Sequence, residues 1–223
     1  MSERVTFTSK AGDQTSGFLA TPPGDGSAPG VIVVHEWWGL NPQIEETSRR
    51  LASEGFLTLA PDLYRGARAG DAAEANKMMT ELDGKRALGD LGGALDFLKA
   101  HPRCNGKVAI TGFCMGGAYT FAAACFIRGL AAAVPFYGLP PKPDWSQVDV
   151  PIMAHVARRD GWVTPAAAEA VHAALTARGQ HMDLHVYDAD HAFMNENRPE
   201  VYDAESARLA WSRTVEFLRA HTT

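Results

Sequence analysis

Apolar and polar side chains alternate in two short runs at the start of the chain, at residues 5–9 and 14–20. Alternation with a period of two is typical of a strand that buries one face. The segment Ala11-Gly12-Asp13 between the runs has the composition of a turn. The pattern therefore predicts an antiparallel hairpin at the N-terminal end.

The pattern changes at residues 31–34, which form a continuous run of β-branched side chains. Such a run is typical of a strand that is buried on both faces of a parallel sheet. From there strand and helix patterns alternate, with predicted strands at 57–60, 107–111, 133–137, 152–156 and 184–187 and predicted helices at 43–53, 72–82, 88–100, 117–127, 165–177 and 204–220.

This alternation predicts an α/β fold with a mostly parallel, doubly wound sheet and helices on both of its faces. The N-terminal hairpin adds antiparallel strands to that sheet. The chain shows no internal repeat and no linker composition, so we expect residues 1–223 to form one domain.

The composition of the chain argues against two classes of partner, nucleic acids and membranes. The chain has 46% hydrophobic residues, which is enough for a full core, and a net charge of −5, which argues against a nucleic-acid-binding surface. The first ten residues do not resemble a signal peptide, and no apolar run approaches the roughly 20 residues that span a bilayer. We expect a cytoplasmic protein with neither nucleic acid nor membrane as a partner.

Residues 112–117 read GFCMGG and lie between a predicted strand and a predicted helix. The spacing matches the G-x-S-x-G nucleophile elbow, in which glycines give room for a sharp strand-to-helix bend. The central residue here is Cys114, and a helix N-terminus favours the reactive thiolate. The alternative is an ordinary glycine-rich turn that contains a buried cysteine.

Four polar residues follow predicted strands, at the edge where ligands of doubly wound sheets bind: Glu36, Cys114, Asp160 and His191. The order nucleophile, acid, histidine is that of α/β-hydrolase triads. His191 would accept the proton of Cys114 and later give it to the leaving group, and Asp160 would orient the imidazole. A histidine after a strand is otherwise a surface or packing residue.

Asp188 and Asp190 compete with Asp160 for the role of the acid, because both lie within three residues of His191. They belong to the same turn as the histidine, whereas a triad takes its acid from the loop after a neighbouring strand. We therefore favour Asp160.

A hydrolase of this kind also needs donors for the developing oxyanion. The expected donors are the backbone N–H groups of Met115, directly after the nucleophile, and Trp37. A carboxylate at the end of a buried strand, as at Glu36, must be paired or solvated. Its candidate partner is the thiol of Cys114, and the alternative is a solvent-facing loop glutamate.

Several aromatic residues fall at predicted strand ends and would form an aromatic pocket for a flat, modestly apolar substrate. They are Trp37, Trp38, Phe113, Tyr137, Trp162 and Phe193. For the tandem Trp37-Trp38, packing of the loop onto the sheet edge is an equal alternative.

The sequence favours neither a metal site nor a cofactor. His181 and His185 are four residues apart on a predicted strand, about 13 Å, which is too far for them to chelate one ion. Cys104 and Cys125 are too distant from Cys114 to pair with it and are interpreted as structural thiols.

The motifs together resemble the dienelactone hydrolase family of α/β-hydrolases over nearly the whole chain. They are HEWWGLN at 35–41, APDLY at 60–64, GFCMGG at 112–117, FYG at 136–138, DGWV at 160–163 and HAF at 191–193. The resemblance implies that Cys114, Asp160 and His191 form the triad. It also implies that Glu36 holds the resting thiol and takes part in its activation when substrate enters.

One position departs from the family pattern. Family members that act on dienelactones are expected to bind the substrate carboxylate with arginines, one of them four residues after the histidine, where this chain has Asn195. Other arginines could substitute if the fold brings them near, and the candidates are Arg65, Arg68, Arg86 and Arg198.

We therefore expect a carboxymethylenebutenolidase-like carboxylic ester hydrolase that opens small esters or lactones through a thioacyl-enzyme intermediate, without a cofactor. One alternative is a non-catalytic small-molecule binding protein on the same fold. The other is a hydrolase of larger acyl or thioester substrates, which the depth of the pocket would distinguish. The sequence gives no argument for an oligomeric state.

Overall fold

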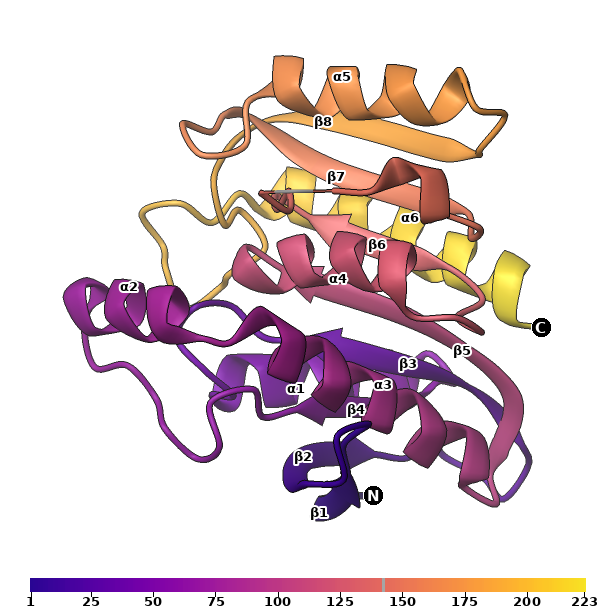
Figure 1. Ribbon diagram of the computed structural model, residues 1–223. Coiled ribbons are helices and arrows are strands. Elements are labelled where there is room, and N and C mark those ends of the chain that lie inside the picture. Colours follow the sequence, from indigo (N-terminus) through magenta and orange to yellow (C-terminus); the bar gives the residue numbers. More distant parts are fainter. Residues whose placement is uncertain (142) are drawn as a thin grey trace.

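The computed structural model describes residues 1–141 and 143–223 and has one eight-stranded sheet at its centre (Figure 1). The strand order is β1-β2-β4-β3-β5-β6-β7-β8. The strands are β1 Ser2–Thr8, β2 Gln14–Ala20, β3 Ala28–Val34, β4 Leu57–Pro61, β5 Cys104–Phe113, β6 Ala133–Phe136, β7 Ile152–Arg159 and β8 Met182–Asp190.

The pairings follow the sequence pattern. Strands β1 and β2 form an antiparallel hairpin, β2 joins β4 in antiparallel register, and every later neighbour is parallel. The mostly parallel sheet with an antiparallel start is therefore confirmed.

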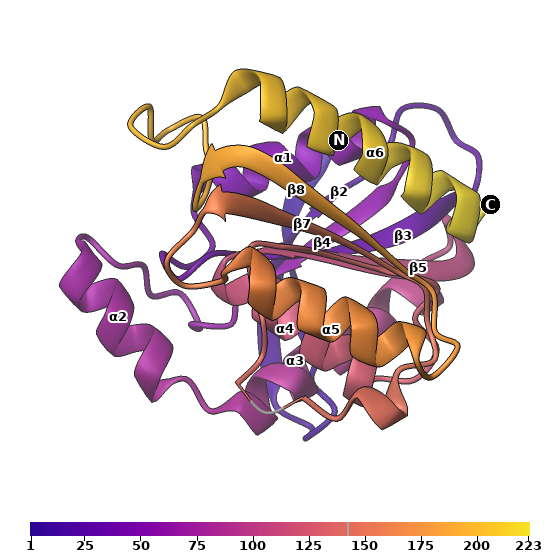
Figure 2. The same cartoon turned by 90° about the horizontal axis from the view of Figure 1, so that it is seen from above.

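Helices cover both faces of this sheet, as expected (Figure 2). Helices α1 (Pro42–Ser53) and α6 (Ala204–Thr222) lie on one face. Helices α3 (Gly84–Ala100), α4 (Met115–Phe126) and α5 (Pro165–Thr176) lie on the other. Helix α2 (Ala72–Glu81) lies to the side of that second layer, and a short 3₁₀ helix spans Trp145–Gln147.

Strand β3 shows how the core is divided. Its side chains at 31–34 are fully buried, and they alternate between two hydrophobic clusters. Ile32 and Val34 join the cluster under α3 and α4, whereas Val31 and Val33 join the cluster under α1 and α6. A strand that is covered on both faces has no position for a polar side chain, which explains its uninterrupted apolar run.

Several boundaries differ from the expectation, and two of these differences have a clear local cause. Helix α4 begins at Met115, two residues before the predicted start, because the bend at Cys114 turns directly into the helix. Helix α3 begins at Gly84 instead of 88, because the side chain of Asp83 caps it by accepting from the N–H of Arg86 at 3.0 Å. The earlier start of α4 places Cys114 at the N-terminus of this helix.

In the ranges 1–141 and 143–223, no helix has the length and apolar character needed to cross a bilayer. Within the same ranges, no three His, Cys, Asp or Glu side chains gather as a set of metal ligands.

Candidate active site

Cys114 lies on a strained bend between β5 and α4, with φ 56° and ψ −116°. A positive φ at a residue other than glycine costs of the order of 1–3 kcal/mol and persists only where the surrounding structure imposes it. Neighbouring backbone imposes it here: a Cβ at Gly116 would lie 2.3 Å from the carbonyl oxygen of Val34. On the other side, a Cβ at Gly138 would lie 2.2 Å from the carbonyl oxygen of Cys114. The glycines of the elbow thus let three chain segments meet at the cysteine.

The thiol of Cys114 occupies the N-cap position of α4 but makes no capping hydrogen bond. Met115 is the first helical residue, and the N–H groups of a first helical turn have no acceptor within the helix. A thiol held at such a position is exposed to the positive end of the helix dipole. The bend therefore presents a sulfur and a free N–H donor to the same space.

His191 follows β8, and its Nδ1 lies 2.7 Å from Oδ2 of Asp160. The other carboxylate oxygen of Asp160 accepts from the backbone N–H groups of Trp162 at 2.7 Å and Val163 at 3.0 Å. Both oxygens of this buried carboxylate therefore have partners. The bond to Nδ1 fixes the ring orientation and leaves Nε2 on the opposite side.

The two competing acids have another partner. Asp188 and Asp190 both pair with Arg159, at 2.6 Å and 3.1 Å. These pairs are exposed and join the last residues of β7 and β8. The structure thus puts Asp160, and neither rival, on the imidazole of His191.

The contacts of Asp160 and His191 explain the direction in which the pKa of each group shifts. Burial alone would raise the pKa of Asp160, but its hydrogen bonds, first of all that with His191, lower it. Burial alone would lower the pKa of His191, but the interactions with Asp160 and with the Cys114 thiol outweigh burial and raise it to about 10. At neutral pH the imidazole is therefore protonated on both ring nitrogens and positively charged.

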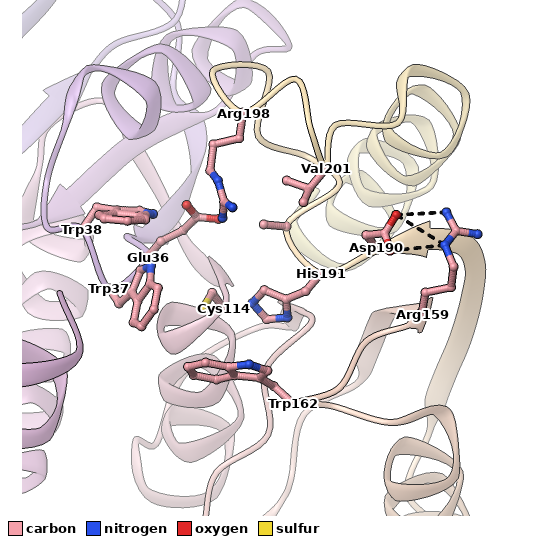
Figure 3. Close-up of a pocket in the computed structure, with 11 residues that line it drawn as sticks. Glu36, Trp37, Trp38, Cys114, Arg159, Trp162, Asp190, His191, Arg198 and Val201 are labelled. Atoms are coloured by element: carbon pink, nitrogen blue, oxygen red, sulfur yellow. Dashed lines mark hydrogen bonds and ion pairs between the residues drawn. The ribbon is translucent and has the colours of Figure 1, made fainter. Parts of the chain in front are cut away.

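Cys114 and His191 share a cavity (Figure 3). The sulfur lies beside the imidazole ring, with Glu36 on one side of the pair and Trp162 on the other. The side chains come from β5, β8 and the loops after β3 and β7, so the ends of four strands contribute to one space.

The carboxylate of Glu36 is buried directly after β3, and its partner differs from the expected one. Its Oε2 accepts from the side-chain amide of Asn195 at 2.9 Å, whereas its Oε1 has no hydrogen-bond partner among the described residues. Burial raises the pKa of Glu36, and the bond from Asn195 only partly opposes this effect. The expectation that the Cys114 thiol pairs with Glu36 is therefore corrected, since the neutral amide occupies that role.

A buried histidine holds the loop that carries Glu36. Nδ1 of His35 lies 2.6 Å from the carbonyl oxygen of Glu36, and its Nε2 accepts from the N–H of Leu63 at 3.2 Å. Burial lowers the pKa of His35, so the neutral ring donates through one nitrogen and accepts through the other. This ring ties the end of β3 to the end of β4 and sets the direction of Glu36 and Trp37.

Two cavities meet at Cys114 and His191. The polar cavity has a volume of about 300 Å³, and its wall includes Glu36, Trp37, Trp38, Arg159 and Arg198. The apolar groove has a volume of about 550 Å³, and its wall includes Leu88, Met115, Ala118, Ala122 and Leu139. Trp162 lines both.

The aromatic residues divide between these cavities and the core. Trp37 and Trp38 line the polar cavity, Trp162 lines both spaces, and Tyr137 lines the apolar groove. The other two are corrected. Phe113 stacks on Phe136 with ring centroids 4.8 Å apart. Phe193 is fully buried against Tyr137 and Tyr187.

Phe113 faces the core because successive residues of a strand point in opposite directions, and Phe113 is the last residue of β5. The next residue, Cys114, takes the cavity side. Phe193 lies two residues after His191 in the turn that follows β8, where Ala192 has a positive φ of 67°, and its ring packs on Tyr187.

Three of the four candidate arginines have structural partners outside the site. Arg65 and Arg86 bind the buried carboxylate of Asp90, at 2.7 Å and 3.5 Å. Arg68 lies 3.8 Å from Glu45. Arg198 alone of the four lines the polar cavity, where its Nε donates to Glu200 at 2.8 Å.

Three residues at the site were not assigned these positions by sequence reasoning. They are His35, Arg159 and the amide of Asn195 as the partner of Glu36. His35 could have been noticed because it directly precedes Glu36 at the end of a fully buried strand. No local pattern marks the other two, since their roles depend on loops that meet only in the folded chain.

Comparison with known proteins shows which family the chain resembles. The sequence model described as the dienelactone hydrolase family matches residues 15–222. "Protein usf" of Aquifex pyrophilus is 38% identical over the full length of both chains. "Carboxymethylenebutenolidase 1" of Cupriavidus pinatubonensis is 31% identical, and the match covers 98% of this chain and 97% of that protein.

A solved structure agrees with the sequence comparisons. A dienelactone hydrolase-like promiscuous phosphotriesterase from metagenomic libraries has a TM-score of 0.90 and 27% identity, with 100% of this chain and 99% of that chain covered. These similarities support the expected carboxylic ester hydrolase. The chain belongs to the dienelactone hydrolase family.

Proposed function

We propose that the protein hydrolyses carboxylic esters or lactones through a triad of Cys114, His191 and Asp160 and a thioacyl-enzyme intermediate. One observation carries the proposal. A cysteine on a strained bend lies beside an imidazole whose far nitrogen is 2.7 Å from a buried, fully hydrogen-bonded carboxylate. This is the arrangement in which a nucleophile, its base and the group that orients the base act together.

In the first half of the reaction His191 holds the proton of Cys114, and the thiolate attacks the carbonyl carbon. The oxyanion that forms accepts hydrogen bonds from the N–H groups of Met115 and Trp37. Collapse of the tetrahedral intermediate breaks the bond to the alcohol oxygen, and His191 donates its proton to that oxygen. The raised pKa of His191, about 10, supports this step, because the ring holds a proton at neutral pH.

In the second half a water molecule attacks the thioester while His191 accepts its proton. The acid leaves, and the sulfur is released for another cycle. Asp160 stabilises the imidazolium in both halves, because its carboxylate remains ionised next to the ring.

Glu36 acts beside this triad as a site that can hold a proton close to the sulfur. Its raised pKa, and its Oε1 without a hydrogen-bond partner among the described residues, support a role as the acceptor of the thiol proton in molecules in which His191 is already charged. Asn195 would then keep the carboxyl group aimed at the cavity. Any proton that Glu36 receives must return before the next cycle, so its contribution is to activation and not to overall stoichiometry.

The test compares two cysteine variants on an activated ester such as p-nitrophenyl acetate. Cys114→Ala is expected to abolish turnover, and Cys104→Ala is the matched control, because Cys104 lies at the far end of β5. Mass spectrometry of the wild-type protein quenched in acid should show one acyl group on Cys114. Turnover by Cys114→Ala at the wild-type rate would remove the thiol from the mechanism.

The polar cavity also bears on whether a substrate carboxylate is needed. Its two arginines, Arg159 and Arg198, already pair with acidic side chains, so an anionic substrate group would have to compete with those partners. We therefore expect hydrolysis of neutral esters and lactones at rates similar to those of carboxylate-bearing ones. A panel of matched lactones with and without a carboxylate tests this, and a strong preference for the acids would contradict it.

A further inference from the structure

The apolar groove is larger than the polar cavity and shares Cys114, Trp162 and His191 with it. It lies between α3, α4 and the loop after β6, and it ends at Cys114 and His191. Apart from His191, none of the described residues in its wall carries a charge. Its volume of about 550 Å³ falls in the range of small-molecule sites, about 300–1,000 Å³.

Helix α4 forms the floor of this groove through one stripe of side chains. Cys114, Ala118, Ala122 and Phe126 follow each other at four-residue intervals, and residues at this spacing lie on one face of a helix. At about 1.5 Å per residue the stripe is roughly 18 Å long. Small side chains at its centre leave the space open, and Phe126 at its end is 52% exposed.

The chemistry of the wall selects an apolar occupant. A charged or strongly polar group would lose its hydration in the groove without gaining a partner, which is costly. Each methylene group placed there leaves water and gains about 0.8 kcal/mol, which is about a fourfold gain in binding. The groove therefore suits an aliphatic or arylaliphatic chain.

The position of the groove indicates which end of an ester it receives. The acyl group is the part that becomes bonded to Cys114, and the groove begins at this residue and continues along its own helix. The leaving oxygen must take a proton from His191, which lines both spaces, but its neighbours Asp190 and Ala192 line the polar cavity and not the groove. The alcohol portion is thus directed to the polar cavity and the acyl portion to the groove.

We propose that the apolar groove binds the acyl chain of the substrate, so that the protein prefers esters of medium-length apolar acids over acetates. This inference rests on the proposed ester hydrolysis and names the substrate class for it. Trp162 marks the boundary, since it lines both spaces, is 63% exposed and packs on Trp37 with ring centroids 5.4 Å apart. The two tryptophans separate the acyl side from the alcohol side.

The first experiment measures kcat/KM for p-nitrophenyl acetate, butyrate, hexanoate and octanoate. With the leaving group constant, each added methylene should raise kcat/KM up to about fourfold, which gives a ratio of the order of 10² between hexanoate and acetate. A parallel series of acetates of longer alcohols should show no such gain. A flat acyl series, or a gain confined to the alcohol series, would overturn the proposal.

The second experiment fills the groove. Ala122→Phe places a ring halfway along the stripe and should lower the hexanoate-to-acetate ratio about tenfold or more, because overpacking excludes the chain. Ala170→Phe is the matched control, since it adds the same ring to an exposed position of α5 outside both cavities. An unchanged ratio in Ala122→Phe would show that the chain does not occupy the groove.

A third measurement separates this inference from the proposed chemistry. Calorimetric titration of Cys114→Ala with methyl ketones from 2-butanone to 2-decanone reports binding without turnover. Affinity that rises with chain length, and that Ala122→Phe removes, supports the groove even if no ester is hydrolysed. Ester turnover with affinity independent of chain length would leave the proposed function intact and overturn the acyl-chain assignment.

Discussion

Asp160 and Glu36 are both buried carboxyl groups that follow strands and approach the same cysteine, but their surroundings differ. Asp160 accepts hydrogen bonds on both oxygens, two from backbone N–H groups, and these bonds lower its pKa. Glu36 has one neutral amide on one oxygen, and burial raises its pKa. The number and charge of the donors, and not burial itself, decide which carboxyl group keeps its negative charge.

This contrast assigns roles. A carboxylate that stays ionised can orient and stabilise an imidazolium, whereas a carboxyl group that holds its proton more firmly can take up and release a proton. Asp160 fits the first task and Glu36 the second. Four changes test the contrast, and they follow in order of decreasing expected effect.

Replacing Asp160 by Asn removes the charge beside His191 and should have the largest effect. We expect kcat to fall by about 10³–10⁴, which corresponds to about 4–5.5 kcal/mol, because the imidazolium loses its stabilising partner. The alkaline limb of the kcat/KM profile, set by a His191 pKa of about 10, should also move to lower pH. Steady-state kinetics between pH 5 and 11 measure both. Asp188→Asn, which touches only the surface pair with Arg159, is the control.

Replacing Asn195 by Ala removes the one hydrogen bond to the Glu36 carboxyl group. The free energy of unfolding should fall by about 1–3 kcal/mol, the usual cost of a buried polar group left without a partner. The loss should be larger at pH 8 than at pH 5, because the ionised carboxylate suffers most. Urea denaturation at the two pH values measures it, with exposed Asn76→Ala on α2 as the control. Equal stability of the two variants would mean that Glu36 does not depend on this amide.

Replacing Glu36 by Gln should change how stability depends on pH. The folded state holds the Glu36 proton more tightly than the unfolded chain, whose pKa is near 4.5. The stabilisation is therefore full below pH 4.5 and is lost as the pH rises through the folded pKa. Relative to the wild type, Glu36→Gln should gain about 1 kcal/mol, or about 2–4 °C in Tm, on going from pH 4.5 to pH 8.

Calorimetric melts at the two pH values check this shift, with exposed Glu216→Gln on α6 as the control. Parallel Tm profiles for the wild type and Glu36→Gln would show that the carboxyl group is ionised throughout, like Asp160.

Replacing Arg198 by Ala should have the smallest effect and sharpen the contrast. The charge of Arg198 lowers the pKa of Glu36, though less than the bond from Asn195 does. Its loss should slightly raise the pH at which the stabilisation linked to the Glu36 proton is lost. The accompanying change in the free energy of unfolding should be less than about 1 kcal/mol, because the guanidinium is partly solvated. The Tm profile between pH 4 and 8 measures this shift, and Arg208→Ala on α6 is the control. A downward shift would contradict the assigned electrostatics.

The fold was accessible from the sequence because its signals are local and agree. The buried run at 31–34 and the regular alternation of strand and helix patterns leave few arrangements other than a doubly wound sheet. The positions of Cys114, Asp160 and His191 follow from that architecture, since parallel strands end at one edge. The pairing of His191 with Asp160 needed only the rule that an acid comes from a neighbouring loop.

The rest of the site depended on contacts that no local pattern encodes. Asn195 and Glu36 are 159 residues apart and meet only because the loop after β8 folds over the end of β3. Phe113 and Phe193 were expected in the pocket but lie in the core. For Phe113 the reason is that the side of the sheet that a residue faces changes with a shift of one position. Phe193 lies in the turn after β8, whose course no periodicity predicts. The apolar groove needed the placement of α3 against α4, which hydrophobic periodicity does not fix.

The polar cavity and the apolar groove join at the sulfur of Cys114, and this arrangement also implies an order of steps in the reaction. In the proposed assignment the alcohol departs through the polar cavity, which is then vacant while the acyl portion still fills the apolar groove. Water can then reach the thioester along the vacated route without displacing the bound chain. We therefore expect double-displacement kinetics in which added alcohols compete with water for the acyl group, so that small alcohols give transesterification.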